Sequence, residues 1–361
     1  MRGSRVFVVC LVACVSAAII AAQTPAAPSS CAPIGALRFV CGPEGPEDLV
    51  AVPRTPLLVS SAMGGAGGIY VVDTSKNTSA KVFPIAASAE RLDAGTYASC
   101  PGPLQGPDRT AFVTHGLYLK PGPRSTHTLY AVHHGGRESI EVFTIDTGLA
   151  PPAVTWIGCV VAPDPLGLNA VVALPEGGFA ATNFDPRPPS GAPAPGVSAK
   201  VLSGDRNGEV WEWHPKTGWA KVPGSEASGA NGLELSADGT WYYVAQWGNR
   251  AFMRLSRGKT PVERQEISVG FRVDNLRWSR DGKTLLAAGQ DRALAELPPG
   301  TGPVSIIGRI DPRAMTYQEL VRQPMPPGLF AATVALEAGR EYWVGSFRGD
   351  RITRYPIPPG K

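Results

Sequence analysis

The feature of this sequence that most limits its fold is a unit that recurs six times. Each unit has one or two polar residues, a strand of alternating apolar residues, a turn and a second strand. In the two clearest units, residues 231–246 and 275–289, an Asp-Gly turn joins two strands of period two. The six units open at Glu47-Asp48-Leu49, Thr114-His115-Gly116, Leu168-Asn169-Ala170, Ala230-Asn231-Gly232, Val273-Asp274-Asn275 and Ala332-Thr333-Val334.

The spacing of these openings predicts an all-β fold, a six-bladed β-propeller. Successive openings lie about 40 to 70 residues apart, which suits a four-stranded blade with its loops. The 42 Gly and 36 Pro among 361 residues favour short strands and tight turns. A β-sandwich rarely extends this far as one domain, and a β-helix would repeat at a shorter interval.

The polar residues at the openings predict a central calcium site. The innermost strand of a blade lines the channel, so the residue at its start faces the axis. Carboxylate and amide oxygens in this number are the ligands that calcium prefers. The alternative is that these residues are turn formers that bond nearby backbone, but their common register favours a shared ion. The predicted ligands are Glu47, Asn169, Asn231, Asp274 and Asn275.

Histidines supply a candidate for proton transfer. His115 stands at a blade opening, and its side chain titrates near neutral pH. The pair His133-His134 follows in the same unit, where strand alternation directs one of the two towards the channel. A histidine on a strand is more often a packing residue. We predict a catalytic role for His115 because the predicted metal site lies close to it.

The N-terminal residues predict export. Arg2 and Arg5 precede an apolar stretch, which is typical of a secretory signal over residues 1–22. We therefore expect a signal peptide, an N-terminal extension over 23–44 and a propeller over 45–361, in a periplasmic or secreted protein. An uncleaved anchor or lipidation at Cys14 are the alternatives.

The charge and the hydropathy of the chain limit its partners. The net charge of +4 without a basic cluster argues against nucleic-acid binding, and no segment of the mature chain is long enough to span a membrane.

Two further features concern stability and access. Four cysteines outside the signal, in an exported chain, indicate two disulfides with three open pairings. A Pro/Gly/Ala-rich loop over 185–199 interrupts the third unit, as a lid or a solvated insertion on one rim. The cysteines are Cys31, Cys41, Cys100 and Cys159.

Several segments together resemble the paraoxonase/arylesterase family of calcium-dependent lactonases. The unit over 229–245 (GANGLELSADGTWYYVA) is shared with gluconolactonase-like and strictosidine-synthase-like propellers and marks only that superfamily. Three segments point to the arylesterase branch: residues 45–49 (GPEDL), 112–119 (FVTHGLYL) and 129–146 (LYAVHHGGRESIEVFTID). Residues 168–183 (LNAVVALPEGGFAATN) and 272–282 (RVDNLRWSRDG) are also similar.

The resemblance implies the same five calcium ligands, with His115 as the catalytic histidine and His134 as its partner. Two departures stand out. Ala170 replaces an acidic ligand of the family's second, structural calcium, although Asp48 and the Leu117 carbonyl remain. The family also ties its N-terminus to its last blade by a disulfide, whereas this chain has no cysteine after Cys159.

The sequence thus predicts a calcium-dependent hydrolase that opens lactones or cleaves aryl or other carboxylic esters, with a small molecule as substrate. Calcium would stabilise the oxyanion, and His115 would activate water. Two alternatives are a gluconolactonase-like sugar-lactone hydrolase that needs no histidine, and a non-catalytic propeller that binds a ligand or a protein. No GxSxG motif supports a serine hydrolase.

Overall fold

The computed structural model describes residues 31–187, 196–324 and 329–357. The predicted signal peptide and the centre of the Pro-rich loop lie outside these residues. The described part is almost entirely β-structure. Its helical elements are two five-residue helices, α1 (Gly106–Thr110) and α2 (Ala199–Ser203), and one 3-10 turn (Leu294–Glu296).

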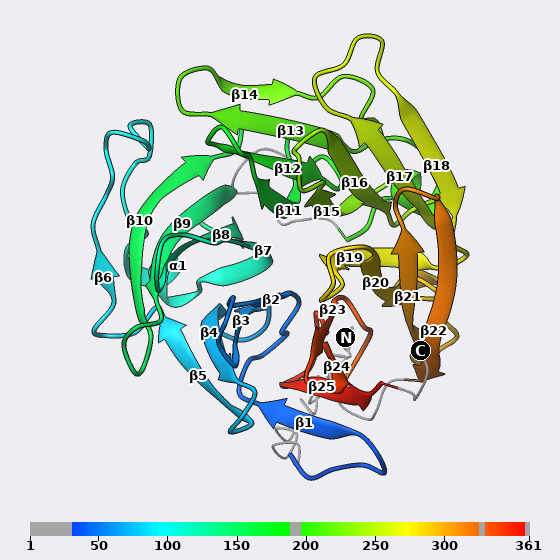
Figure 1. Cartoon of the computed structure of the whole chain (residues 1–361), viewed down its shortest axis with the longest axis horizontal. Helices are drawn as coiled ribbons and strands as arrows, with labels where there is room; N and C mark the ends of the chain where they lie inside the picture. The colour runs from blue at the N-terminus through cyan, green and yellow to red at the C-terminus, as the bar shows by residue number, and fades with distance from the viewer. Residues whose placement is uncertain (1–30, 188–195, 325–328, 358–361) are drawn as a thin grey trace, which may run out of the picture. The chain divides into compact units, whose positions relative to one another are not determined.

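The strands form six sheets, so the predicted six-bladed propeller is confirmed (Figure 1). The innermost strand of each blade begins within three residues of the start of a predicted opening: β2 (Leu49–Ala51), β7 (Val113–Lys120), β11 (Leu168–Ala173), β15 (Ala230–Leu235), β19 (Arg272–Trp278) and β23 (Ala335–Ala338). These strands contact one another in turn, and the last contacts the first, which places them around one axis.

Antiparallel strands extend each blade outward. In chain order they are β3 (Leu57–Ala62), β4 (Gly68–Asp73), β5 (Thr78–Phe83), β8 (Thr126–His134), β9 (Ser139–Asp146), β10 (Ala153–Val161), β12 (Phe179–Asn183), β13 (Glu209–His214), β14 (Gly218–Lys221), β16 (Trp241–Gln246), β17 (Ala251–Ser256), β18 (Arg264–Ser268), β20 (Leu285–Gln290), β21 (Val304–Asp311), β22 (Thr316–Pro324), β24 (Glu341–Val344) and β25 (Arg351–Pro356). In the second blade, β6 (Ala89–Glu90) adds a short parallel pairing to β10.

A strand from the start of the described chain closes the ring. β1 (Arg38–Cys41), from the segment before residue 45, pairs antiparallel with β25 and becomes the outer strand of the sixth blade. Val40 on β1 is buried in a cluster with Leu49 of the first blade and Trp343 of the sixth. Strand pairing therefore performs the closure for which the chain lacks a disulfide.

The hydrophobic core lies between neighbouring blades. Strand β11 shows the principle, because both of its faces are buried. Val171 and Ala173 belong to a cluster with the second blade, while Ala170 and Val172 belong to a cluster with the fourth. Since alternate residues of a strand point to opposite faces, one inner strand joins two cores. The axis-facing ends of these strands are thereby held in place.

Two disulfides join Cys31 to Cys41 and Cys100 to Cys159, as the cysteine count predicts. They are consistent with an exported protein. Among the described residues, no helix has the length and apolar character that a membrane crossing requires.

Candidate active site

In four blades the innermost strand is irregular at its opening. Its pairing with the next strand shifts register within residues 114–117, 168–171, 230–233 and 273–276. A bulge releases residues from the ladder and redirects their side chains. Inside these gaps lie His115, Asn169, Asn231, Asp274 and Asn275. The local irregularity is what allows two consecutive residues, Asp274 and Asn275, to serve one site.

Glycines permit neighbouring blades to approach closely at the same level. A Cβ atom at Gly116 would lie 2.3 Å from the Asn169 carbonyl oxygen, and one at Gly232 would lie 2.6 Å from the Asp274 carbonyl oxygen. Both distances are far below van der Waals contact. A side chain at either position would push apart the strands that carry the site.

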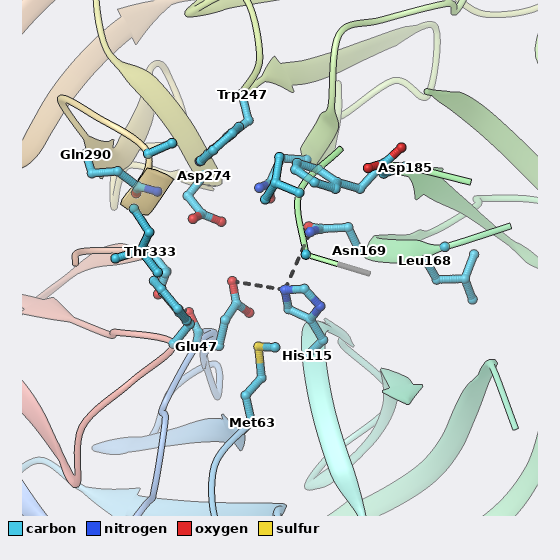
Figure 2. A pocket seen from close by; sticks show the side chains of 18 of the residues that line it. Glu47, Met63, His115, Leu168, Asn169, Asp185, Trp247, Asp274, Gln290 and Thr333 are labelled. Carbon is cyan, nitrogen blue, oxygen red and sulfur yellow. Dashed lines mark hydrogen bonds and ion pairs between the residues drawn. The ribbon is translucent and has the colours of Figure 1, made fainter. Parts of the chain in front are cut away.

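The opening residues surround a cavity of about 530 Å³ (Figure 2). Of the predicted site residues, Asn275 lies just outside the wall and donates from its Nδ2 to Glu47 Oε1 at 2.6 Å. His134 lies behind His115 rather than in the wall. The openings contribute to the wall Glu47, His115, Asn169, Asn231, Asp274 and Thr333.

Four oxygen atoms of the predicted calcium ligands are buried and have no hydrogen-bond partner. An unsatisfied buried acceptor costs about 1–3 kcal/mol, so four at one place require an explanation. A hard cation provides one, because every one of these atoms is an oxygen. The atoms are Glu47 Oε2, Asn169 Oδ1, Asn231 Oδ1 and Asn275 Oδ1.

The electrostatics of the two carboxyl groups agree with this explanation. Burial and, next, the negative charge of Glu47 raise the pKa of Asp274 well above its usual range. Glu47 is itself 1 % exposed, and Thr333 Oγ1 fixes its backbone by donating to the Glu47 carbonyl at 2.6 Å. A cation between the carboxyl groups of Glu47 and Asp274 would stabilise both groups in their ionised form. The residues present therefore fit a calcium ion.

His115 lies at the edge of this oxygen cluster. Its Nε2 is 3.5 Å from Glu47 Oε1 and 3.5 Å from Asn169 Nδ2 (Figure 2). Its Nδ1 is 2.8 Å from His134 Nε2. The structure thus brings together the two histidines that the resemblance paired, with one nitrogen of His115 facing the cavity.

His133 points the other way. Its ring stacks on Phe112, and its nitrogens lie 2.9 Å from the Val113 carbonyl and 2.8 Å from the Gly135 carbonyl. The strand alternation therefore assigns His134 to the channel side.

Sequence reasoning missed Glu138. Its Oε2 lies 2.9 Å from Nδ1 of His134, on the side remote from His115. The signal was present, since Glu138 follows His134 by four residues across a Gly-Gly turn.

Apolar side chains from the loops also line the cavity. Met63, Trp247 and Phe347 contribute from three blades. Arg187, from the described start of the Pro-rich loop, and the exposed Arg348 also line it. A small molecule with an apolar body would contact these residues while its polar end reached the oxygen cluster.

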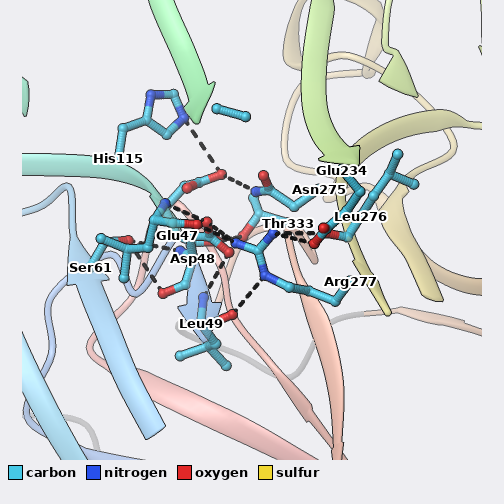
Figure 3. Close-up of polar contacts among 12 residues, drawn as sticks. Glu47, Asp48, Leu49, Ser61, His115, Glu234, Asn275, Leu276, Arg277 and Thr333 are labelled. Carbon is cyan, nitrogen blue, oxygen red and sulfur yellow. Dashed lines mark hydrogen bonds and ion pairs between the residues drawn. The ribbon is translucent and has the colours of Figure 1, made fainter. Parts of the chain in front are cut away.

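The buried guanidinium group of Arg277 lies beside this oxygen cluster (Figure 3). Arg277 of β19 contacts the Asp48 carboxylate through Nη2 and Glu234 Oε1 through Nη1, the latter at 3.3 Å. Its Nη2 also donates to the Leu117 carbonyl at 3.0 Å, and its Nε to the Leu49 carbonyl at 2.9 Å. One side chain thereby joins the inner strands of four blades.

This network bears on the second calcium ion that the resemblance would imply. Asp48 and the Leu117 carbonyl, which the resemblance implies as remaining ligands, both bind Arg277. Burial raises the pKa of Asp48 to about 6 and that of Glu234 to about 7, against the opposing effect of the Arg277 charge. A guanidinium therefore supplies positive charge at this position.

A second group of potential metal ligands lies away from the cavity, where Glu176, Glu212 and His214 come together. Arg257 Nε donates to Glu212 at 2.9 Å, and the Tyr242 hydroxyl donates to it at 2.6 Å. The Glu212 carboxylate already has donors, unlike the four unpartnered oxygens at the blade openings.

No protein-family model matches the sequence, and no curated protein matches it significantly. Solved structures share its fold. A luciferin-regenerating enzyme is 12% identical, with 89% of this chain and 94% of that chain covered and a TM-score of 0.52. A putative gluconolactonase is 17% identical, with 90% and 95% covered and a TM-score of 0.50. At these identities the likeness concerns the six-bladed propeller, the fold of gluconolactonase-like proteins.

Proposed function

We propose that this protein is a calcium-dependent hydrolase that opens lactones or cleaves aryl or other carboxylic esters by the attack of water. The observation that carries the proposal is the set of four unpartnered buried oxygens at the blade openings, three of which belong to residues that line one cavity with His115. A metal site next to a histidine, under an apolar wall, is an arrangement suited to polarising a carbonyl and activating water.

The ion would be held by Glu47, Asn169, Asn231, Asp274 and Asn275. Two carboxylates and three amides match the ligand preference of calcium, and no sulfur ligand is among them. When bound, calcium would stabilise the negative charge that develops on the ester carbonyl oxygen as the carbonyl is attacked.

The histidines would handle the proton. His115 Nε2 faces the cavity and would accept a proton from the attacking water. Burial lowers the pKa of His134 to about 4, so this residue is neutral near pH 7 and available to accept a hydrogen bond from His115. The proton on His115 would then pass to the departing oxygen of the ester.

The apolar wall bears on the choice of substrate. Trp247, Phe347 and Met63 offer contact area but few hydrogen bonds, which suits an aryl or aliphatic group better than a polyol. A sugar lactone is the second candidate, because the fold is shared with a putative gluconolactonase and because Gln290 and Asp185 add polar groups to the wall.

Hydrolysis of phenyl acetate, an aliphatic δ-lactone and a sugar lactone, each with calcium and then with chelator, tests the proposal. We expect turnover of the first two substrates and its loss on chelation. Turnover confined to the sugar lactone would favour the second candidate. Absence of any turnover, in a protein whose melting temperature still falls on chelation, would leave a non-catalytic calcium propeller.

A further inference from the structure

We propose that Glu138 is a positioning residue, which fixes the tautomers of His134 and His115 so that His115 presents an unprotonated Nε2 to the cavity. The inference rests on the proposed hydrolase function, in which His115 accepts a proton. Glu138 stands at no blade opening, and neither the repeat nor the family resemblance assigns it a role.

Three side chains form a continuous line from the interior to the cavity. Glu138 Oε2 is 2.9 Å from His134 Nδ1, and His134 Nε2 is 2.8 Å from His115 Nδ1. All three are largely buried, with side-chain exposures of 14 %, 10 % and 13 %. The far end of the line, His115 Nε2, faces the oxygen cluster.

The hydrogen-bonding capacity of each group allows one assignment of protons. An ionised carboxylate can only accept, so the proton of neutral His134 is on Nδ1 and its Nε2 bears a lone pair. That lone pair accepts from His115, which places the His115 proton on Nδ1. The remaining lone pair of His115 is then on Nε2, where a water molecule in the cavity can be deprotonated.

The same carboxylate would stabilise the charge that forms. When water transfers a proton to His115 Nε2, His115 becomes a cation that still donates through Nδ1 to His134. The negative charge of Glu138 at the other end of the line favours that cation. The proton leaves when His115 donates it to the departing oxygen, which restores the first state. A third group that orients and supports a catalytic histidine in this way is a recurrent feature of hydrolases.

Two further contacts fix Glu138 and keep it ionised. Its Oε1 accepts a hydrogen bond from the Leu168 backbone N–H at 2.7 Å, and its Oε2 lies 3.2 Å from Arg187 Nη1. Burial raises the pKa of Glu138, but His134, Arg187 and this backbone donor together hold it below its usual range. Because Leu168 precedes Asn169, the carboxylate that orients the histidines also contacts the strand of a proposed calcium ligand.

Replacing Glu138 by Gln tests the inference. A glutamine amide can donate to His134 Nδ1, which would reverse both tautomers and put the His115 proton on Nε2. We expect kcat on the preferred ester to fall at least about 100-fold, with KM and calcium affinity changed less than about threefold. Glu138→Asp keeps a carboxylate and is expected to recover part of kcat.

Tautomers are measured directly by ¹⁵N NMR of histidine-labelled protein, with no substrate present. Wild-type protein should show Nδ1–H on both His115 and His134, and the Glu138→Gln variant should show Nε2–H on His115. Because this measurement is independent of turnover, it decides the role of Glu138 even if the wild type hydrolyses no ester, a result that would refute the proposed function instead.

Glu337→Gln is the matched control. Glu337 has the same 14 % exposure, pairs with Arg309 at 3.3 Å and accepts a backbone N–H from Arg280 at 3.1 Å, but it contacts no histidine in the described structure. This variant is expected to lose some stability and to keep kcat. Wild-type tautomers and wild-type kcat in Glu138→Gln would overturn the inference, as would an equal loss of kcat in Glu337→Gln.

Discussion

At the scale of single residues, the site is distinguished by acceptors without donors. Buried amide oxygens normally receive a hydrogen bond, yet three asparagines of the openings do not. Their amide nitrogens are partly engaged, as in the bond from Asn275 to Glu47. The oxygens are thereby left without donors, which suits a bound ion better than a set of turn formers that bond nearby backbone.

The opening residues could be predicted from the sequence because they repeat at one register of the blade. Glu138 was missed because it occupies no blade opening, although it follows His134 by only four residues. Arg277 could not be predicted, because its partners are remote in the chain. Arg277 lies 229 positions from Asp48 and 43 from Glu234. Only the closure of the ring brings these groups together, and a single sequence contains no pattern that reports it.

Asn169→Leu separates metal binding from folding. The side chain keeps its approximate volume but loses the unpartnered Oδ1 and the weak contact at 3.5 Å with His115. We expect calcium affinity to fall at least about tenfold. The free energy of unfolding of the calcium-free protein should change by less than about 1 kcal/mol, because an unsatisfied acceptor has been removed. Calorimetric calcium titration and urea denaturation measure the two quantities, and unchanged affinity would exclude Asn169 as a ligand.

His115→Gln tests the general base. Glutamine retains a polar group beside Glu47 but cannot accept the proton, so kcat should fall about 10²–10⁴-fold while calcium affinity is kept. His214→Gln, in the group of ligands outside the cavity, should leave both quantities unchanged. Full turnover in His115→Gln would remove this residue from the mechanism.

At the scale of elements, the six inner strands follow from the repeated unit of a polar opening and an alternating strand, which is clearest in the two units with Asp-Gly turns. The bulges at their openings were not predicted, because a bulge shows in a sequence only as one extra residue. Strand β1 was also not predicted. It comes from four residues outside any repeat, and its partner β25 is more than 300 positions further along the chain.

Val40→Ala tests whether β1 closes the ring. Val40 is 1 % exposed and packs against residues of the first and sixth blades. Truncation leaves a cavity between the first and sixth blades, and we expect a loss of about 2 kcal/mol in the free energy of unfolding. Arg38→Ala, at an exposed position of the same strand, should cost less than about 0.5 kcal/mol. Equal stability of the two variants in urea denaturation would contradict the closing role of β1.

At the scale of the whole molecule, two positive charges are expected near the axis, and they differ in origin. The proposed calcium ion would bind reversibly and would serve catalysis. Arg277 is part of the chain, and it links β19 to β2, β7 and β15 through Leu49, Leu117 and Glu234. The inner ring therefore retains one central cation when calcium is removed. On this basis the wild type should bind one calcium ion per chain in the axial region, and chelation should abolish turnover but leave the protein folded.

The variant Arg277→Met separates the contribution of Arg277 to stability from the contribution of calcium to catalysis. It leaves the carboxylates of Asp48 and Glu234 buried without their cation, and removing one partner of a buried ion pair typically costs about 3–5 kcal/mol. Adding Glu234→Gln removes one of the two carboxylates that are left without a cation, so the double variant should recover part of that loss.

If calcium can replace the guanidinium, the Arg277→Met protein will bind a second ion through Asp48, and its melting temperature will become more sensitive to chelator than that of the wild type. Calorimetric stoichiometry and thermal unfolding with and without chelator decide the matter. Two ions per wild-type chain in the axial region, or unfolding of the wild type on chelation, would show that Arg277 does not supply the charge on which the ring depends.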